Sequence, residues 1–153
     1  MEPLRFTAVP YDRARHEGFV RSSWTNGAHE PWESITKLVP APGSNGATMV
    51  YKHVGLAELL RRPETQCLVA HLPGDPDSLL GWAAVTDGAV VWAYTRSLFG
   101  KVRRRGLATS LLYRMGIDVA EPTPCLYWSP AAAAIAARGY RIYYAPKGLK
   151  EAA

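Results

Sequence analysis

A strand-like segment joined to a helical segment by a basic, glycine-containing loop constrains this chain more than any other stretch. Residues 90–95 (Val-Val-Trp-Ala-Tyr-Thr) are β-branched, aromatic or small, which is typical of a buried strand. Residues 107–115 place their apolar side chains on one helical face, and the loop before them ends in three arginines and a glycine (103–106). The first amides of a helix lack backbone acceptors, and the helix dipole is positive there, so this junction is predicted to bind an anion, phosphate above all. The alternative is that the three arginines are solvated loop charges.

The rest of the chain is predicted to alternate between strands and helices within a single α/β domain spanning residues 1–153. Helices are expected at 11–24, 49–62, 107–115 and 130–138, and strands at 4–9, 66–72, 79–86, 89–95, 125–128 and 140–145. Residues 29–47 are expected to be irregular, residues 73–78 to form a turn, and Asp87-Gly88 to close a hairpin. The expected order is β-α-α-β-β-β-α-β-α-β.

The charge of the chain is unevenly distributed. The formal net charge is +5, and residues 101–153 hold nine Lys or Arg against three Asp or Glu, which accounts for all of the excess. A locally basic surface suits an anionic cofactor or a nucleic acid, and basicity alone does not choose between them.

Several classes of protein are not indicated by the sequence. The N-terminal segment has no apolar run of signal-peptide length, and no stretch is long enough to cross a membrane, so a cytoplasmic location is expected. Cys67 and Cys125 lie in apolar, strand-like surroundings without a CxxC or paired-histidine pattern. They are interpreted as buried thiols, and no metal site is expected.

Two motifs resemble those of the GNAT N-acetyltransferase superfamily. Arg103-x-x-Gly106-x-Ala108 matches its Q/R-x-x-G-x-G/A signature, and Ala136-Ala137-Arg138-Gly139-Tyr140 resembles its second conserved unit, a helix ending at Gly before an aromatic residue. The expected order of elements is also that of the superfamily. More narrowly, the segment 19–24 together with Tyr94-Thr95 resembles short members carried by bacteriophages. The resemblance implies a mixed, mostly antiparallel central sheet with flanking helices.

The resemblance also implies acetyl-CoA as cofactor. The amides of residues 104–109 would hold its pyrophosphate, while its pantetheine arm would pair with the edge of the 89–95 strand. The implied cofactor-binding residues are Ala93, Tyr94, Thr95, Arg103, Arg104, Arg105, Gly106, Leu107, Ala108 and Thr109. Seven residues separate Thr95 from Arg103, a few more than is usual in the family.

The proton donor is less clearly indicated. Many family members carry a tyrosine four residues before the glycine of the last helix, where this chain has Ile135. Candidate catalytic residues are Tyr127, Ser129 and Tyr94. The alternatives are that Tyr127 is a core residue, that Ser129 only caps a helix, and that water donates the proton.

Candidate substrate-binding residues lie in and before the irregular segment. They are Trp24, His29 and Trp32, with a core position (Trp24) or a solvated loop (the other two) as the alternative.

These observations favour an acetyl-CoA-dependent N-acetyltransferase acting on an unidentified amine, a small molecule or a protein. One alternative is a degenerate GNAT domain that binds CoA or a partner protein without turnover. Another is an acetyltransferase acting on aminoacyl-tRNA, a nucleic acid partner that the charge permits but does not favour. The sequence leaves a homodimer open.

Overall fold

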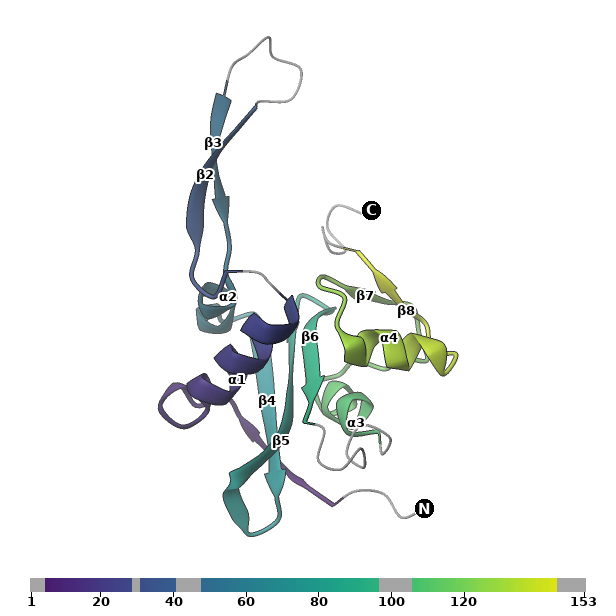
Figure 1. Ribbon diagram of the computed structural model, residues 1–153. Helices are drawn as coiled ribbons and strands as arrows, with labels where there is room; N and C mark the ends of the chain where they lie inside the picture. Colours follow the sequence, from purple (N-terminus) through teal and green to yellow (C-terminus); the bar gives the residue numbers. More distant parts are fainter. Residues whose placement is uncertain (1–4, 29–30, 41–47, 97–105, 146–153) are drawn as a thin grey trace.

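The computed structural model describes residues 5–28, 31–40, 48–96 and 106–145. The structure is a mixed α/β fold in which helices and strands alternate along much of the chain (Figure 1). In chain order they are β1 (Thr7–Pro10), α1 (Arg13–Ala28), β2 (Ile35–Pro40), β3 (Thr48–His53), α2 (Leu56–Arg61), β4 (Thr65–Leu72), β5 (Asp75–Thr86), β6 (Ala89–Thr95), α3 (Leu107–Arg114), β7 (Thr123–Cys125), α4 (Pro130–Ala137) and β8 (Ile142–Tyr144).

Six of the strands form one sheet in the order β1-β4-β5-β6-β7-β8. The pairs from β1 to β6 are antiparallel, whereas β6–β7 and β7–β8 are parallel. The expectation of a mixed, mostly antiparallel sheet with flanking helices is therefore confirmed.

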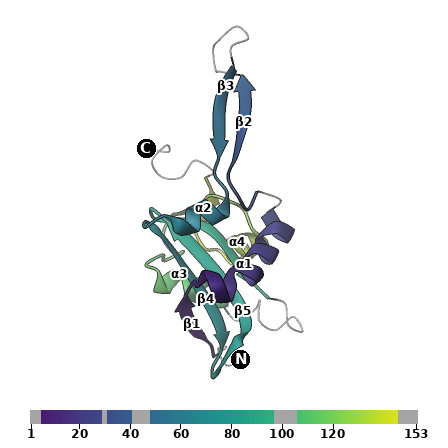
Figure 2. The ribbon, with the colours of Figure 1, turned by 90° about the vertical axis from the view of Figure 1, so that its left-hand side faces the viewer.

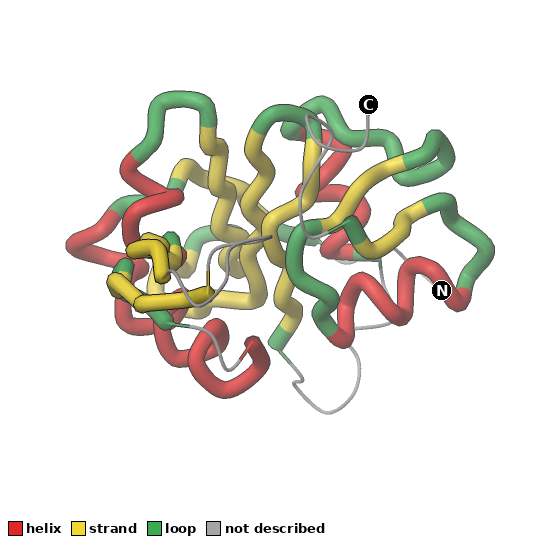
Figure 3. Tube along the Cα trace, turned by 90° about the horizontal axis from the view of Figure 1, so that it is seen from above, coloured by secondary structure: helices red, strands yellow, loops and turns green. Residues whose placement is uncertain are grey.

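Helices cover both faces of this sheet, as the views from the side and from above show (Figures 2 and 3). Side chains alternate between the two faces of a strand, so β4, β5 and β6 contribute to two separate cores. On one face α1 and α2 pack against the sheet through Val20, Trp24, Leu56, Leu59, Val69, Trp82 and Trp92. On the other face α3 and α4 pack through Leu80, Val85, Val90, Leu107, Leu111, Leu112 and Ile135.

Two of the predicted local signals are confirmed. Asp87 and Gly88 both have positive φ (48° and 78°), the backbone geometry of a two-residue hairpin between β5 and β6. Gly139 has a φ of 91° just after α4, as expected of a glycine that ends a helix. By contrast, the turn expected at 73–78 is shorter, because Leu72 already pairs with Asp75 around Gly74.

The region between α1 and α2 differs from the prediction. Residues 48–53 form strand β3 instead of the first half of a helix, and residues 35–40 of the supposedly irregular segment form strand β2. The two strands pair in register from Ile35 opposite His53 to Pro40 opposite Thr48. They project from the body of the molecule as a hairpin (Figures 1 and 2). Alternating strand-forming residues on both sides of a Pro- and Gly-rich stretch would have indicated it.

Helix limits also differ. Helix α1 spans Arg13–Ala28 and so ends four residues beyond the expected range 11–24, and α2 is confined to Leu56–Arg61 instead of the expected 49–62. Within the described residues, no helix is both long and apolar enough to cross a membrane. Cys67 and Cys125 are free thiols, and burial raises the pKa of Cys125 to about 12.

Candidate functional site

Strands β6 and β7 separate soon after they meet. Among the described residues, their ladder is limited to Val90 opposite Cys125, reinforced by the Leu126 amide donating to the Val90 carbonyl at 2.8 Å. Beyond that point the edge of β6 from Trp92 to Thr95 has no ladder with β7. The sheet therefore opens at this place, between α1 on one side and α3 and α4 on the other.

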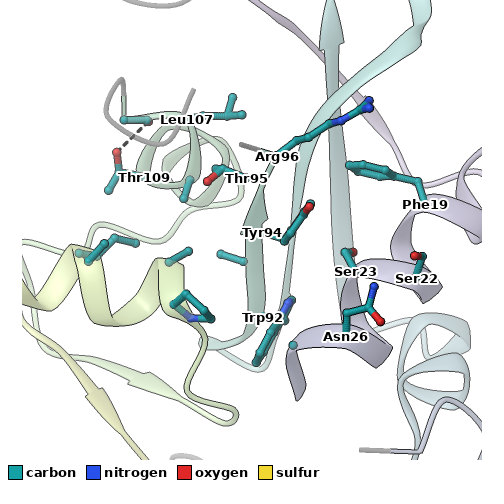
Figure 4. A pocket seen from close by; sticks show the side chains of 18 of the residues that line it. Phe19, Ser22, Ser23, Asn26, Trp92, Tyr94, Thr95, Arg96, Leu107 and Thr109 are labelled. Carbon is teal, nitrogen blue, oxygen red and sulfur yellow. Dashed lines mark hydrogen bonds between the residues drawn. The ribbon is translucent and has the colours of Figure 1, made fainter. Parts of the chain in front are cut away.

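A cavity of about 750 Å³ occupies this opening (Figure 4). Its wall combines one face of α1, the end of β6, the first turn of α3 and one face of α4. The lining residues are Gly18, Phe19, Ser22, Ser23, Asn26 and Gly27 from α1; Trp92, Ala93, Tyr94, Thr95 and Arg96 from β6 and its end; Gly106, Leu107, Ala108 and Thr109 from α3; and Pro130, Ala131, Ala134, Ile135 and Arg138 from α4 and its end.

The edge of β6 offers backbone donors to this cavity. The Arg96 amide donates to the Leu80 carbonyl of β5 at 2.7 Å. Successive amides of a strand point to opposite edges, so the amides of Ala93 and Thr95 are directed away from β5, toward the edge that lines the cavity. An extended ligand could therefore hydrogen-bond to this edge as an additional strand would.

The first turn of α3 offers a second set of donors. Gly106 caps the helix with a left-handed backbone (φ 72°), and no side chain caps the amides that follow it. The Gly106 carbonyl accepts from the Ser110 amide (3.0 Å) and from the Thr109 hydroxyl (2.9 Å). The amides of Leu107, Ala108 and Thr109 precede that first helical bond and have no acceptor within the helix, so this end of the cavity suits an anion.

Among the described residues, the charged side chains that line the cavity are all basic. Arg96 and Arg138 line it, and none of its described lining residues is Asp or Glu. Nor do any three described His, Cys, Asp or Glu side chains cluster as metal ligands would. The positive charge of these residues would therefore favour an anionic ligand over a cationic one.

Trp92, a lining residue of the cavity, carries a buried donor without a partner among the described residues. Trp92 is 2% exposed, and its Nε1 has no hydrogen-bond partner among the described residues. Trp24 shares this property, with its ring edge-on to Trp92 at 5.2 Å. An indole N–H that has lost water without gaining an acceptor lowers the stability of the fold.

The structure brings together most of the predicted cofactor residues. Ala93, Tyr94, Thr95, Gly106, Leu107, Ala108 and Thr109 all line the cavity. Arg103, Arg104, Arg105 and His29 lie outside the described residues.

The other candidates lie outside the lining. The Tyr127 ring packs edge-on against Trp24 at 5.0 Å, and Trp24 itself is 1% exposed. The Ser129 hydroxyl is buried and accepts from the Ala132 amide at 3.0 Å, so it caps α4. Trp32 is buried against α2 and lines a separate cavity of about 230 Å³. Of the three catalytic candidates, Tyr94 alone lines the main cavity.

Sequence reasoning missed the wall that α1 contributes. Gly18, Ser22 and Asn26 recur every four residues and therefore share one helical face. That stripe of small and polar residues, unlike the apolar stripe of Val20 and Trp24, was the available signal. The positions of Arg96 and Arg138 in the wall carried no comparable signal.

Comparisons of the chain with protein-family models, with curated proteins and with solved structures found no match. Function must therefore be inferred from the cavity and its chemistry.

Proposed function

We propose that the protein is an acetyl-CoA-dependent N-acetyltransferase of the GNAT type. The observation that carries the proposal is one cavity joining the uncapped first turn of α3 to the edge of β6 where β7 departs. A diphosphate needs the first feature, and an extended amide-containing arm needs the second.

The arrangement of the elements supports this proposal. With the β2–β3 hairpin set aside, the remaining elements follow one another in the order that the resemblance implied. The hairpin lies between α1 and α2, away from the strand–loop–helix unit that carries the signature motif. The separation of two parallel strands, β6 and β7, also falls where the superfamily places the pantetheine arm.

The residues present suit each part of such a cofactor. The amides of Leu107, Ala108 and Thr109 would hold the pyrophosphate, with Arg138 adding positive charge nearby. The Ala93 amide on the edge of β6 would hydrogen-bond to the pantetheine arm. A backbone amide of this edge would also polarise the thioester carbonyl.

Bound acetyl-CoA supplies an activated acetyl group as a thioester. The amine nitrogen of the acceptor attacks the carbonyl carbon, a C–N bond forms, the C–S bond breaks, and the proton lost by the amine ends on the thiolate sulfur or in water. The half-buried Tyr94 hydroxyl is the candidate donor in the cavity wall, and water is the alternative.

Two observations favour a second function, a domain that binds CoA without turnover. Ile135, at the position where many family members carry a tyrosine, is 4% exposed and lines the cavity. No described lining residue is a His, Asp or Glu that could act as a base.

Two measurements on the same protein separate these functions. Calorimetry with CoA tests the cavity, and mass spectrometry of a cell extract incubated with the protein and isotope-labelled acetyl-CoA tests transfer. Binding together with labelled, protein-dependent amides supports the transferase. Binding without new amides or thiol release supports the degenerate domain, and absence of CoA binding contradicts both.

A further inference from the structure

The α1 wall of the cavity carries accessible, uncharged hydrogen-bonding groups. Ser22 and Asn26 both line the cavity and are exposed, and Figure 4 shows their side chains on this wall. Their polar groups, a hydroxyl and a carboxamide, can each donate and accept a hydrogen bond. Gly18, one turn earlier on the same face, leaves the wall open, since a Cβ built there would meet no described atom within 4 Å. A neutral, polar ligand therefore has room to lie along α1.

The spacing of these groups matches that of an extended peptide. Ser22 and Asn26 are one helical turn apart, which is about 6 Å along the axis of α1. In an extended chain, every second residue directs its main-chain N–H and C=O to the same edge, at intervals of about 6.6 Å. The two side chains are thus spaced to hydrogen-bond to main-chain groups on one edge of an extended peptide.

The lining of the cavity also restricts the protonation state of an acceptor amine. An amine must be neutral to attack a thioester, and no described lining residue is a His, Asp or Glu that could remove its proton. Arg96 and Arg138 add positive charge, which disfavours an ammonium group further. The cavity therefore suits an amine that is already neutral in solution.

The terminal α-amine of a peptide meets this condition far better than a lysine side chain does. Its usual pKa is about 7.7–8.0, so about a third of it is neutral at pH 7.5. A lysine amine, with a usual pKa of about 10.4, is only about 0.1% neutral at the same pH. The α-amine is thus favoured about 200- to 300-fold in the reactive form, without a base from the protein.

We propose that the acceptor is the N-terminal α-amine of a peptide or protein, whose first residues lie extended along α1. The Asn26 carboxamide and the Ser22 hydroxyl bind main-chain groups of this segment. The α-amine nitrogen forms the C–N bond to the acetyl carbon as the C–S bond to CoA breaks, and the proton of the amine passes to the thiolate or to water. This assignment rests on the proposed function and specifies its substrate class.

Rates of acetyl transfer to matched amines at pH 7.5 test the acceptor class. The principal probes are tetrapeptide amides, X-alanyl-alanyl-alanine amide with X each amino acid except lysine, and the corresponding amino acid amides, which lack the peptide segment. An N-terminally acetylated tetrapeptide with one internal lysine offers only an ε-amine, and a mixture of aminoacyl-tRNAs offers an α-amine on a nucleic acid. For at least one X, kcat/KM of the tetrapeptide is expected to exceed that of every comparison amine at least tenfold.

Variants of α1 test the role of its two polar residues. The double variant Ser22→Ala/Asn26→Ala is expected to reduce the tenfold gain of the tetrapeptide over its amino acid amide to less than threefold. Thr25→Ala, at an exposed position of α1 outside the cavity, is expected to preserve that gain. Equal kcat/KM for every tetrapeptide and its amino acid amide, a preference for the ε-amine or for aminoacyl-tRNA, or an unchanged gain in the double variant would overturn the inference.

Binding of the peptide is measured separately, so that failure of the proposed function gives a different pattern. The side-chain amide signal of Asn26 in ¹⁵N-labelled protein, which an Asn26→Ala variant identifies, is followed as the tetrapeptide amides are added. If the signal shifts but CoA does not bind or no acetyl amide forms, the peptide site stands and the transferase does not. If other amines are acetylated and no tetrapeptide shifts the signal, the transferase stands and the peptide acceptor does not. Absence of both transfer and shift contradicts both.

Discussion

The indole N–H of Trp82 on β5 donates to the hydroxyl of Ser23 on α1 at 2.7 Å, across 59 residues of sequence. The same hydroxyl donates to the Val20 carbonyl at 3.0 Å, and both partners are buried. This pair fixes α1 against the sheet beside the cavity, so the wall formed by Phe19, Ser22 and Asn26 depends on it.

Replacement of Ser23 by alanine leaves the buried Trp82 N–H without an acceptor. The free energy of unfolding is expected to fall by about 1–3 kcal/mol, the cost of one unsatisfied buried donor. Urea denaturation measures it. Ser22→Ala, one position earlier on α1 but exposed, is the matched control and should change stability by less than about 0.5 kcal/mol. Equal effects of the two changes would show that the Ser23–Trp82 bond is unimportant.

The sequence predicted the sheet and its helices well where local signals and burial agree. A two-residue hairpin turn of this kind requires positive φ at both central residues, and an Asp-Gly pair such as Asp87-Gly88 adopts that geometry readily. The helical period places three leucines of α3 on the same face of the helix, and this face packs into one core (Leu107, Leu111 and Leu112). In contrast, Val50 and Val54 mimic a helical period although Val50 lies in β3, where its pairing partner Leu38 is twelve residues away. A short apolar run suits either structure, and pairing with a distant strand decides between them.

Only the part of the site that comes from one continuous segment of the chain could be predicted from the sequence. Ala93 and Gly106 belong to a continuous strand–loop–helix unit, so their proximity follows from the sequence. Asn26 and Arg138 reach the same cavity from α1 and α4, through packing that no local pattern encodes. Ser129 illustrates the opposite error, since a serine before proline at a helix start is explained by capping alone.

Replacement of Ser129 by alanine tests whether this residue caps a helix or takes part in chemistry. Loss of the bond from the Ala132 amide is expected to reduce stability by about 1 kcal/mol. The rate of thiol release from acetyl-CoA, measured well below the melting temperature, should be unchanged. A loss of rate without a loss of stability would make Ser129 a catalytic residue instead.

The stability of the protein is expected to fall as the pH is lowered from 7.5 to 5.5, in part through His16. This side chain is 2% exposed, and its Nδ1 accepts from the Asp12 amide at 2.9 Å. Burial lowers the pKa of His16 below its usual 6.5, and nearby Asp12 opposes that effect only partly. Below pH 6.5 the unfolded chain therefore binds a proton that the folded chain resists, which favours unfolding.

A His16→Gln variant isolates this contribution. Its free energy of unfolding, measured by urea denaturation at each pH, should decline less steeply than that of the original protein over the same range. Parallel pH profiles for the two proteins would exclude His16 as the group responsible.

The most direct test of the central claim is whether CoA stabilises the protein through the first turn of α3. Gly106→Glu places a negative side chain at the proposed diphosphate site, where a Cβ would already lie 3.3 Å from the Thr109 hydroxyl. Gly116→Glu is the matched control, because Gly116 has a similar positive φ (85° against 72°) beyond the opposite end of α3 and no atom crowds it.

Thermal denaturation with and without CoA supplies the measurement. At a CoA concentration about 100 times its Kd, the original protein and Gly116→Glu should each gain about 2.7 kcal/mol of stability, whereas Gly106→Glu should gain none. A full gain in Gly106→Glu, or no gain in the original protein, would contradict the account.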